Sequence, residues 1–276
     1  MAKRVLVVAN RTVGGRKLLE AVKARASDDA EFHLVVPLTR PKHGDVIYDH
    51  AQRDAAQLRI DLSHAFLKRQ GIEVTGEVGD EDPFTATLDA VAAYRPDEIV
   101  VSTLPETRSG WLRRDLVERI QDETGLPVEH IVTDPDTEGL AVGVTLVVAN
   151  RTSAGHELID VLKEQAAEDD ERVFVCVIPQ EGGEGHAAHV ARERLGRLLR
   201  TLRDNGILAS GMIGEPDPYD ATMNALSLFT VDKVVISTLP GEKSGWLRND
   251  LISRVRENTR ADVTHVEVDV SETANV

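Results

Sequence analysis

Short apolar runs alternate with amphipathic stretches along the first half of the chain. Each run is apolar at consecutive positions, which is typical of a strand covered on both faces of a parallel sheet. The runs lie at residues 5–9, 32–36, 72–78, 98–101 and 128–132. Between the second and third runs, residues 51–66 carry apolar side chains at spacings of three and four, and this helical pattern ends at Gly71. Because strands and helices alternate, we expect a mostly parallel sheet with right-handed crossovers.

The same pattern returns in the second half. Residues 9–12 recur with the same sequence as residues 149–152, and residues 102–116 share eleven of fifteen residues with 237–251. The sequence therefore predicts one domain duplicated, with fold class α/β and a five-stranded parallel sheet in each copy. The predicted parts are a first domain at residues 1–133, an acidic and turn-rich linker at 134–143, and a second domain at 144–276.

The composition argues against several classes of protein. A formal net charge of -15 over 276 residues disfavours a nucleic-acid duplex or an anionic membrane as the main partner. No segment approaches the length of a membrane span, and the first apolar run is too short for a signal peptide. The single cysteine, Cys176, lies in an apolar run and cannot form an intrachain disulfide. We therefore expect a cytoplasmic protein.

Polar residues gather after the first and fourth strands of each half, which is where open parallel sheets hold their ligands. Asparagine suits the edge of a base, hydroxyls and arginines suit phosphate, and a serine-glycine helix start offers free N–H groups. The candidates in the first half are Asn10, Arg11, Thr12, Val36, Ser102, Thr103, Ser109, Gly110 and Arg113. Those in the second half are Asn150, Arg151, Thr152, Ile178, Ser237, Thr238, Ser244, Gly245 and Arg248.

The order of strands and helices resembles that of the universal stress protein family, in two tandem copies that cover essentially the whole chain. The polar triplet after the first strand, the turn from Gly79 to Pro83 and the Ser-Gly loop after the fourth strand carry the resemblance. It implies strand order 3-2-1-4-5, a fold of the adenine-nucleotide α-hydrolase type and a role in stress responses. Some members bind ATP. The resemblance also implies pairing through the fifth strands, here Val128–Val132 and residues 263–270, within one chain or in a homodimer.

The sequence departs from the ATP-binding signature of that family. The aspartate after the first strand is replaced by Asn10 and Asn150, and the first signature glycines by Ser102 and Pro105 in one half and by Ser237 and Pro240 in the other. Proline lacks an N–H group, so it cannot replace a glycine that cradles phosphate. We therefore expect any ATP or AMP to be held by a different anion contact, such as the Ser109 N–H groups with Arg113.

Two readings remain open. In the first, each half has a degenerate crevice for an adenine nucleotide or another anion. In the second, the protein binds no nucleotide and is a structural or interaction protein whose halves form an intramolecular pseudo-dimer. The asparagines could instead tie loop backbone, and Trp111 and Trp246 could be packing residues. No nucleophile-base-acid set or metal motif is recognisable, so we expect no enzyme, with slow nucleotide hydrolysis as the most that could occur.

Overall fold

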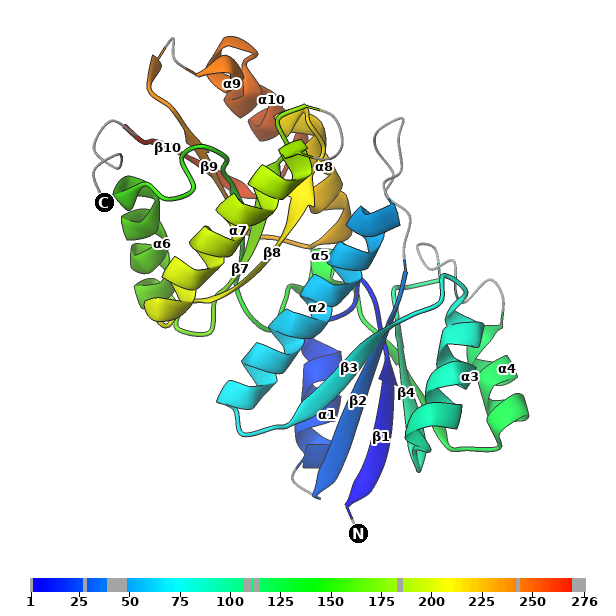
Figure 1. The fold of residues 1–276 in the computed structure, drawn as a ribbon. Helices are drawn as coiled ribbons and strands as arrows, with labels where there is room; N and C mark the ends of the chain where they lie inside the picture. The colour runs from blue at the N-terminus through cyan, green and yellow to red at the C-terminus, as the bar shows by residue number, and fades with distance from the viewer. Residues whose placement is uncertain are drawn as a thin grey trace. The chain divides into compact units, whose positions relative to one another are not determined.

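The computed structural model of the protein describes residues 2–26, 29–38, 49–106, 111, 115–182, 186–241 and 244–269. The side chains of residues 49–51 and 248 lie outside the description. The chain divides into two compact units (Figure 1), each of which is described by itself. Unit 1 comprises Met1–Arg40 and Ala56–Ala141, and unit 2 comprises Pro41–Ala55 and Val142–Val276.

Unit 1 contains a five-stranded parallel sheet with the order β3-β2-β1-β4-β5. This is the predicted order 3-2-1-4-5. The strands are β1 (Lys3–Val8), β2 (Ala30–Pro37), β3 (Val74–Gly79), β4 (Glu98–Thr103) and β5 (Val128–Val132). The helices are α1 (Arg16–Ala26), α3 (Pro83–Tyr94), α4 (Leu116–Thr124), α5 (Pro135–Glu138) and α2 (Asp49–Arg69), which belongs to this unit from Ala56 onward.

Unit 2 repeats this architecture with the order β10-β9-β6-β7-β8. If the five strands of this half are numbered 1 to 5 in chain order, the sheet read from its other edge again has the order 3-2-1-4-5. The strands are β6 (Val144–Val148), β7 (Val173–Pro179), β8 (Leu208–Gly214), β9 (Lys233–Thr238) and β10 (Asp262–Glu267). The helices are α6 (His156–Glu168), α7 (His186–Asp204), α8 (Pro218–Leu228), α9 (Gly245–Arg248) and α10 (Leu251–Asn258).

Helices cover both faces of each sheet, which explains the continuous apolar strands. All five residues of β6 and all seven of β7 are buried. On one face of unit 2, residues of α6 and α7 form a core cluster with Phe174 and Cys176. On one face of unit 1, residues of α3 and α4 pack with Leu6 and Ile99. Each half therefore has its own hydrophobic core, as expected for a duplicated domain.

A glycine ends the third strand of each half because a helix passes very close to it. A Cβ atom at Gly79 would lie 2.6 Å from the Cβ of Ala86 on α3. A Cβ atom at Gly214 would lie at the same distance of 2.6 Å from the Cβ of Ala221 on α8. Any side chain at either position would push the helix off the sheet, so the recurrent glycine serves packing.

Some predicted boundaries were wrong. The fourth strand was predicted to end at residue 101, but β4 continues to Thr103, so Ser102 belongs to the sheet. The last strand was predicted over residues 263–270, but β10 ends at Glu267. The helix predicted to follow Ser244 is broken, because Asp250 has a φ of 53° and separates α9 from α10. Asp115 has a φ of 48° at the start of α4, and a left-handed residue cannot continue a right-handed helix.

The segment predicted as a linker contains α5, which is anchored to unit 1. Asp134 caps this helix by accepting from the N–H of Asp136. Lys17 pairs with Glu138 at 2.8 Å, and the N–H of Ala141 donates to the carbonyl of Gly14. Residues 134–141 therefore have fixed partners within the first half.

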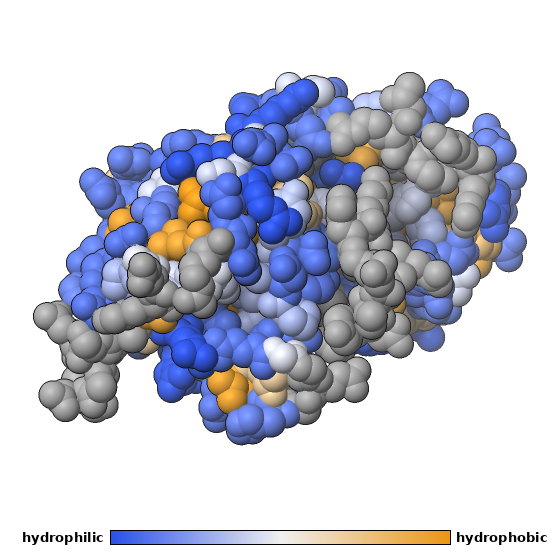
Figure 2. All heavy atoms as spheres, turned by 90° about the horizontal axis from the view of Figure 1, so that it is seen from above, coloured by the Kyte–Doolittle hydropathy of each residue, from blue (hydrophilic) through white to orange (hydrophobic). Residues whose placement is uncertain are grey.

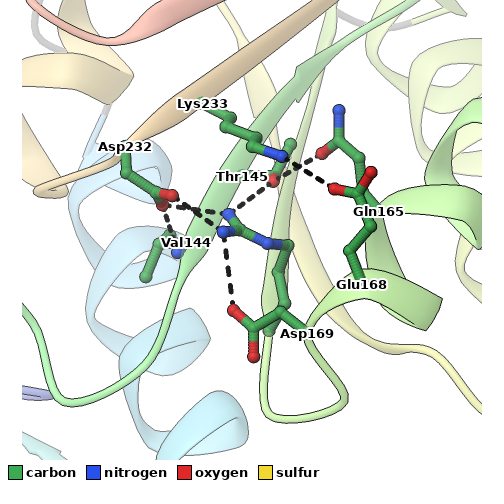
Figure 3. Close-up of polar contacts among 8 residues, drawn as sticks. Val144, Thr145, Gln165, Glu168, Asp169, Asp232 and Lys233 are labelled. Carbon is green, nitrogen blue, oxygen red and sulfur yellow. Dashed lines mark hydrogen bonds and ion pairs between the residues drawn. The ribbon is translucent and has the colours of Figure 1, made fainter.

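A polar cluster fixes the amino ends of β6 and β9 at the edge opposite their carboxyl ends (Figure 3). The guanidinium group of Arg172 donates to both carboxylate oxygens of Asp232, at 3.0 and 2.8 Å. It also donates to the hydroxyl of Thr145 at 3.2 Å. The Asp232 carboxylate accepts in addition from the N–H of Val144 at 2.6 Å. Arg172 is only 8% exposed, so its charge is compensated inside the protein.

The surface offers little apolar area in the part of the chain that is described. Figure 2 shows a mainly hydrophilic face with small, separate hydrophobic patches. Among the described residues, Val132 is the large hydrophobic side chain that is exposed, at 39%. No helix in the described ranges combines the length and the apolar character that a membrane crossing requires.

Candidate functional site

The candidate site lies where the first and fourth strands of each half end side by side. In unit 2, β6 pairs in parallel with β7 on one side and with β9 on the other. In unit 1, β1 lies in the same way between β2 and β4. The strand order therefore reverses at the first strand of each half. In open α/β sheets, the crevice outside the carboxyl ends at this point is the usual ligand site.

A cavity of about 300 Å³ occupies this position in unit 2. Its walls come from the segment after β6, the loop after β7, the end of β9 and the start of α9. The lining residues are Asn150, Arg151, Thr152, Glu181, Ser237, Thr238, Leu239, Ser244, Gly245 and Trp246. The volume is at the lower end of the range for small-molecule pockets.

A buried serine at the end of the fourth strand has an unused hydroxyl in each half. Ser237 is 1% exposed, and its Oγ has no hydrogen-bond partner within the described protein. Ser102 is also 1% exposed and has an equally unpartnered Oγ. Buried polar groups without a partner are rare in native proteins, because each costs about 1–3 kcal/mol. The same unpartnered hydroxyl thus recurs at equivalent positions of the two halves.

Threonine hydroxyls connect the first and fourth strands at the same place. The Oγ1 of Thr152 donates to the carbonyl of Ser237 at 3.1 Å, and the Oγ1 of Thr12 donates to the carbonyl of Ser102 at 3.2 Å. Both threonines are 2% exposed. They link the segment after the first strand to the fourth strand, and their hydroxyl protons are used in these hydrogen bonds.

The asparagine after the first strand connects to the end of the second strand. The Nδ2 of Asn150 donates to the carbonyl of Pro179 at 3.1 Å, and the Nδ2 of Asn10 donates to the carbonyl of Pro37. These amide groups therefore tie backbone, which was one of the two roles considered from the sequence. Both asparagines are only 6% exposed.

An arginine of the long helix α7 reaches the crevice of unit 2. The Nη1 of Arg194 donates to the Oδ1 of Asn150 and lies 3.4 Å from an oxygen of Glu181. The Nε of Arg151 also donates to Glu181, at 2.7 Å. The hydrogen bond from Arg151 is the main cause of a lowered pKa of Glu181, so this carboxyl group is ionised at neutral pH. Two arginines and one carboxylate thus form a charged cluster at the cavity.

The equivalent arginine of unit 1 is more deeply buried. Arg59, on α2, is 3% exposed. Burial, with a smaller contribution from the charge of Arg11, lowers the pKa of Arg59 to about 9, which leaves it charged at neutral pH. Arg11 lies 3.7 Å from the carboxylate of Asp136 on α5. In unit 1, two arginines are therefore also near enough to influence each other, with an acid from a different segment beside Arg11.

A histidine of the fifth strand contacts the last threonine of the fourth strand in each half. The Nε2 of His130 and the Oγ1 of Thr103 share a hydrogen bond of 2.8 Å, as do His265 and Thr238. Burial lowers the pKa of both histidines. These threonines were predicted as ligand contacts; each is bonded to a histidine, and Thr238 also lines the cavity of unit 2.

The other predicted residues have varied positions. Val36 and Ile178 are completely buried in β2 and β7, and Ile178 belongs to the core cluster rather than to the cavity lining. Ser244 lines the cavity and caps α9 by accepting from the N–H of Leu247 at 3.3 Å. Three predicted residues, Ser109, Gly110 and Arg113, lie outside the described residues, as does the side chain of Arg248.

Sequence reasoning missed Arg59, Arg194 and Glu181. The repeat contained a signal for the first two, because each arginine precedes the glycine after its long helix, Gly71 or Gly206, by the same twelve positions. Glu181 had no such signal, because it belongs to a loop that differs between the halves.

The cavity combines hydroxyls, an amide, an aromatic ring and a charged cluster. Among the described residues, no group of three His, Cys, Asp or Glu side chains is arranged to hold a metal ion.

No protein-family model matches the sequence, and no curated protein matches it. Among solved structures, the chain is similar to a universal stress protein from Archaeoglobus fulgidus DSM 4304, with a TM-score of 0.37, 13% identity and coverage of 96% of each chain. A protein of the universal stress protein family from Burkholderia pseudomallei is similar with a TM-score of 0.35 and 18% identity, covering 47% of this chain and 95% of that one. A universal stress protein in complex with cAMP is similar with a TM-score of 0.35 and 13% identity, covering 48% of this chain and 98% of that one. Universal stress proteins are thus among the solved structures to which this chain is similar, and both of its sheets have the strand order that the sequence resemblance implied.

Proposed function

We propose that the protein is a cytoplasmic ligand-binding module of the universal stress protein type, in which each half binds an adenine nucleotide such as ATP or AMP at the carboxyl ends of its first and fourth strands. Its role is binding in a stress response rather than catalysis. The fold and the duplicated crevice residues support this proposal.

The single observation that carries the proposal is the unpartnered hydroxyl of Ser237 in the cavity of unit 2. A ligand group that donates or accepts a hydrogen bond there would satisfy this hydroxyl. The same unpartnered hydroxyl at Ser102 supports a corresponding site in the first half.

The other lining residues fit a nucleotide by their chemistry. Trp246 offers an aromatic face for a base, and the hydroxyl-rich strand ends suit a ribose. Arg151 and Arg194 would contact a phosphate group once the Glu181 side chain has moved away from them. The phosphate contact therefore differs from a glycine cradle, in keeping with Pro105 and Pro240 in the sequence.

Isothermal titration calorimetry of the full chain with ATP, AMP, cAMP and adenosine tests the proposal. We expect binding of at least one of these ligands to the wild-type protein. The double variant Ser102→Ala and Ser237→Ala should bind it about tenfold more weakly, which corresponds to the loss of one good hydrogen bond per site. Absence of binding at millimolar ligand concentrations would reject the proposal.

A second candidate function is a nucleotide-free structural or interaction protein. The observation in its favour is that Asn10, Asn150, Thr12 and Thr152 all bond to strand ends within their own half. If these residues only hold the sheet together, the serine variants will not change binding of any small molecule. Pairing of the two halves through their fifth strands belongs to this second candidate and stays a prediction.

A further inference from the structure

Glu181 brings a negative charge to the cavity of unit 2. Its carboxylate is bonded to Arg151 at 2.7 Å and lies 3.4 Å from the Nη1 of Arg194. A ligand phosphate would seek the same two guanidinium groups, because arginine binds carboxylate and phosphate in the same way. The side chain of Glu181 therefore occupies an anion position that the protein itself has built.

The charges of Arg151 and Glu181 offset each other at the cavity wall, and Arg194 adds a positive charge 3.4 Å from Glu181. Among the described residues that line the cavity, Arg151 is the cation and Glu181 is the anion. Arg194 is not one of the lining residues; its side chain is 17% exposed and also donates to Asn150. A phosphate group on a ligand would have to displace the Glu181 carboxylate from the arginines or bind beside it against electrostatic repulsion. An uncharged ligand is not repelled by this carboxylate.

We propose that Glu181 determines the specificity of the second crevice: its carboxylate is a built-in counter-anion, so this crevice binds an uncharged nucleoside in preference to a nucleoside phosphate. The inference rests on the proposed function and specifies it for one half of the protein. The unpartnered hydroxyl of Ser237 and the ring of Trp246 remain for the ribose and the base.

The acidic residue at this position occurs in the second half of the sequence and has no counterpart in the first. Glu181 follows Pro179 by two positions, and the residue that follows Pro37 by two positions is Thr39, which has no charge. Thr39 lies outside the described residues. We therefore confine the inference to unit 2.

The test uses the full chain with Trp246 as a local reporter. The protein has two tryptophans, and Trp111→Phe leaves Trp246 as the one that remains. In this background, fluorescence titrations with adenosine and AMP measure binding at the second crevice. We expect adenosine to bind at least as tightly as AMP. Glu181→Gln should raise the affinity for AMP about fivefold to tenfold and change that for adenosine by less than about twofold, the scale of removing one unit charge beside a phosphate.

Two further variants separate this role from a general change in charge. Glu193→Gln removes the same charge from an exposed position on α7, where Glu193 faces His189. It should leave both affinities unchanged. Adding Arg194→Gln to Glu181→Gln should abolish the gain in AMP affinity.

The outcomes distinguish this inference from the proposed function. If adenosine binds but Glu181→Gln does not raise the affinity for AMP, or Glu193→Gln raises it equally, the inference is overturned and the proposed function stands. A gain that survives Arg194→Gln also overturns the inference. If neither adenosine nor AMP binds to any variant, both proposals fail for this crevice.

Discussion

Arg194 on α7 donates a hydrogen bond to Asn150 in the wall of the crevice of unit 2, although 44 positions separate them in the chain. The guanidinium group donates to Oδ1, while Nδ2 of the same asparagine donates to the carbonyl of Pro179. One side chain thus connects the long helix α7, the end of β6 and the end of β7. Asn150 is therefore a structural joint of the crevice as well as part of its wall.

Asn150→Ala should destabilise the protein. The variant removes both hydrogen bonds and leaves the Pro179 carbonyl without this donor, so we expect a loss of about 2 kcal/mol in the free energy of unfolding. Urea denaturation followed by circular dichroism measures it. Asn205→Ala is the control, because the exposed Asn205 also donates to a backbone carbonyl, that of Thr201. The control should lose less than about 0.5 kcal/mol.

Ser237→Ala should leave stability unchanged or raise it by up to about 1 kcal/mol, because it removes a buried hydroxyl that has no partner. Ser244→Ala, at a second buried serine of the same cavity, should instead cost about 1 kcal/mol because it removes the cap of α9. Thermal unfolding without ligand compares the two. A large loss in Ser237→Ala would mean that its hydroxyl has a structural partner after all, and it would remove the main support for a ligand site.

Asp232→Ala should be strongly destabilising. It leaves the buried Arg172 without its bidentate partner and the N–H of Val144 without its acceptor, so we expect a loss of about 2–4 kcal/mol. Lys233→Ala, at the next residue, removes an exposed ion pair with Glu168 at 3.3 Å and should cost less than about 1 kcal/mol. Similar losses for the two variants, measured by urea denaturation, would contradict the assigned role of Asp232.

The histidines of the fifth strands should make stability depend on pH in a mildly acidic window. Burial lowers the pKa of His130 and His265 below the ordinary value of 6.5. As the pH falls through 6.5, the unfolded chain therefore takes up these protons before the folded protein does, and stability decreases with falling pH. The contribution is fully present above the unfolded pKa.

The double variant His130→Gln and His265→Gln tests this dependence. Its free energy of unfolding should decline less than that of the wild type between about pH 7 and pH 5, because glutamine does not titrate. Urea denaturation at several pH values gives the two slopes. Equal slopes would show that other groups, such as carboxylates, cause the whole decline.

Much of the fold could be predicted from the sequence. The strands of a parallel sheet covered on both faces are continuous apolar runs. A strand such as Val144–Val148 can therefore be recognised without knowing which strands lie beside it. The duplication is visible because the residues at the strand ends recur with little change. The strand order was implied by the family resemblance rather than by the pattern, since alternation alone does not say which strands are neighbours.

The interior of the site could be predicted only in part. The sequence determined by itself that Asn150, Ser237 and their counterparts lie at the carboxyl ends of the first and fourth strands, because these positions are fixed by the chain. The tertiary structure decided that the asparagine amide ties Pro179, that the serine hydroxyl has no partner, and that Arg194 and Glu181 reach the crevice. The physical reason is that hydrogen bonds and ion pairs depend on distances of a few ångströms between segments far apart in the chain, and local periodicity carries no information about those distances.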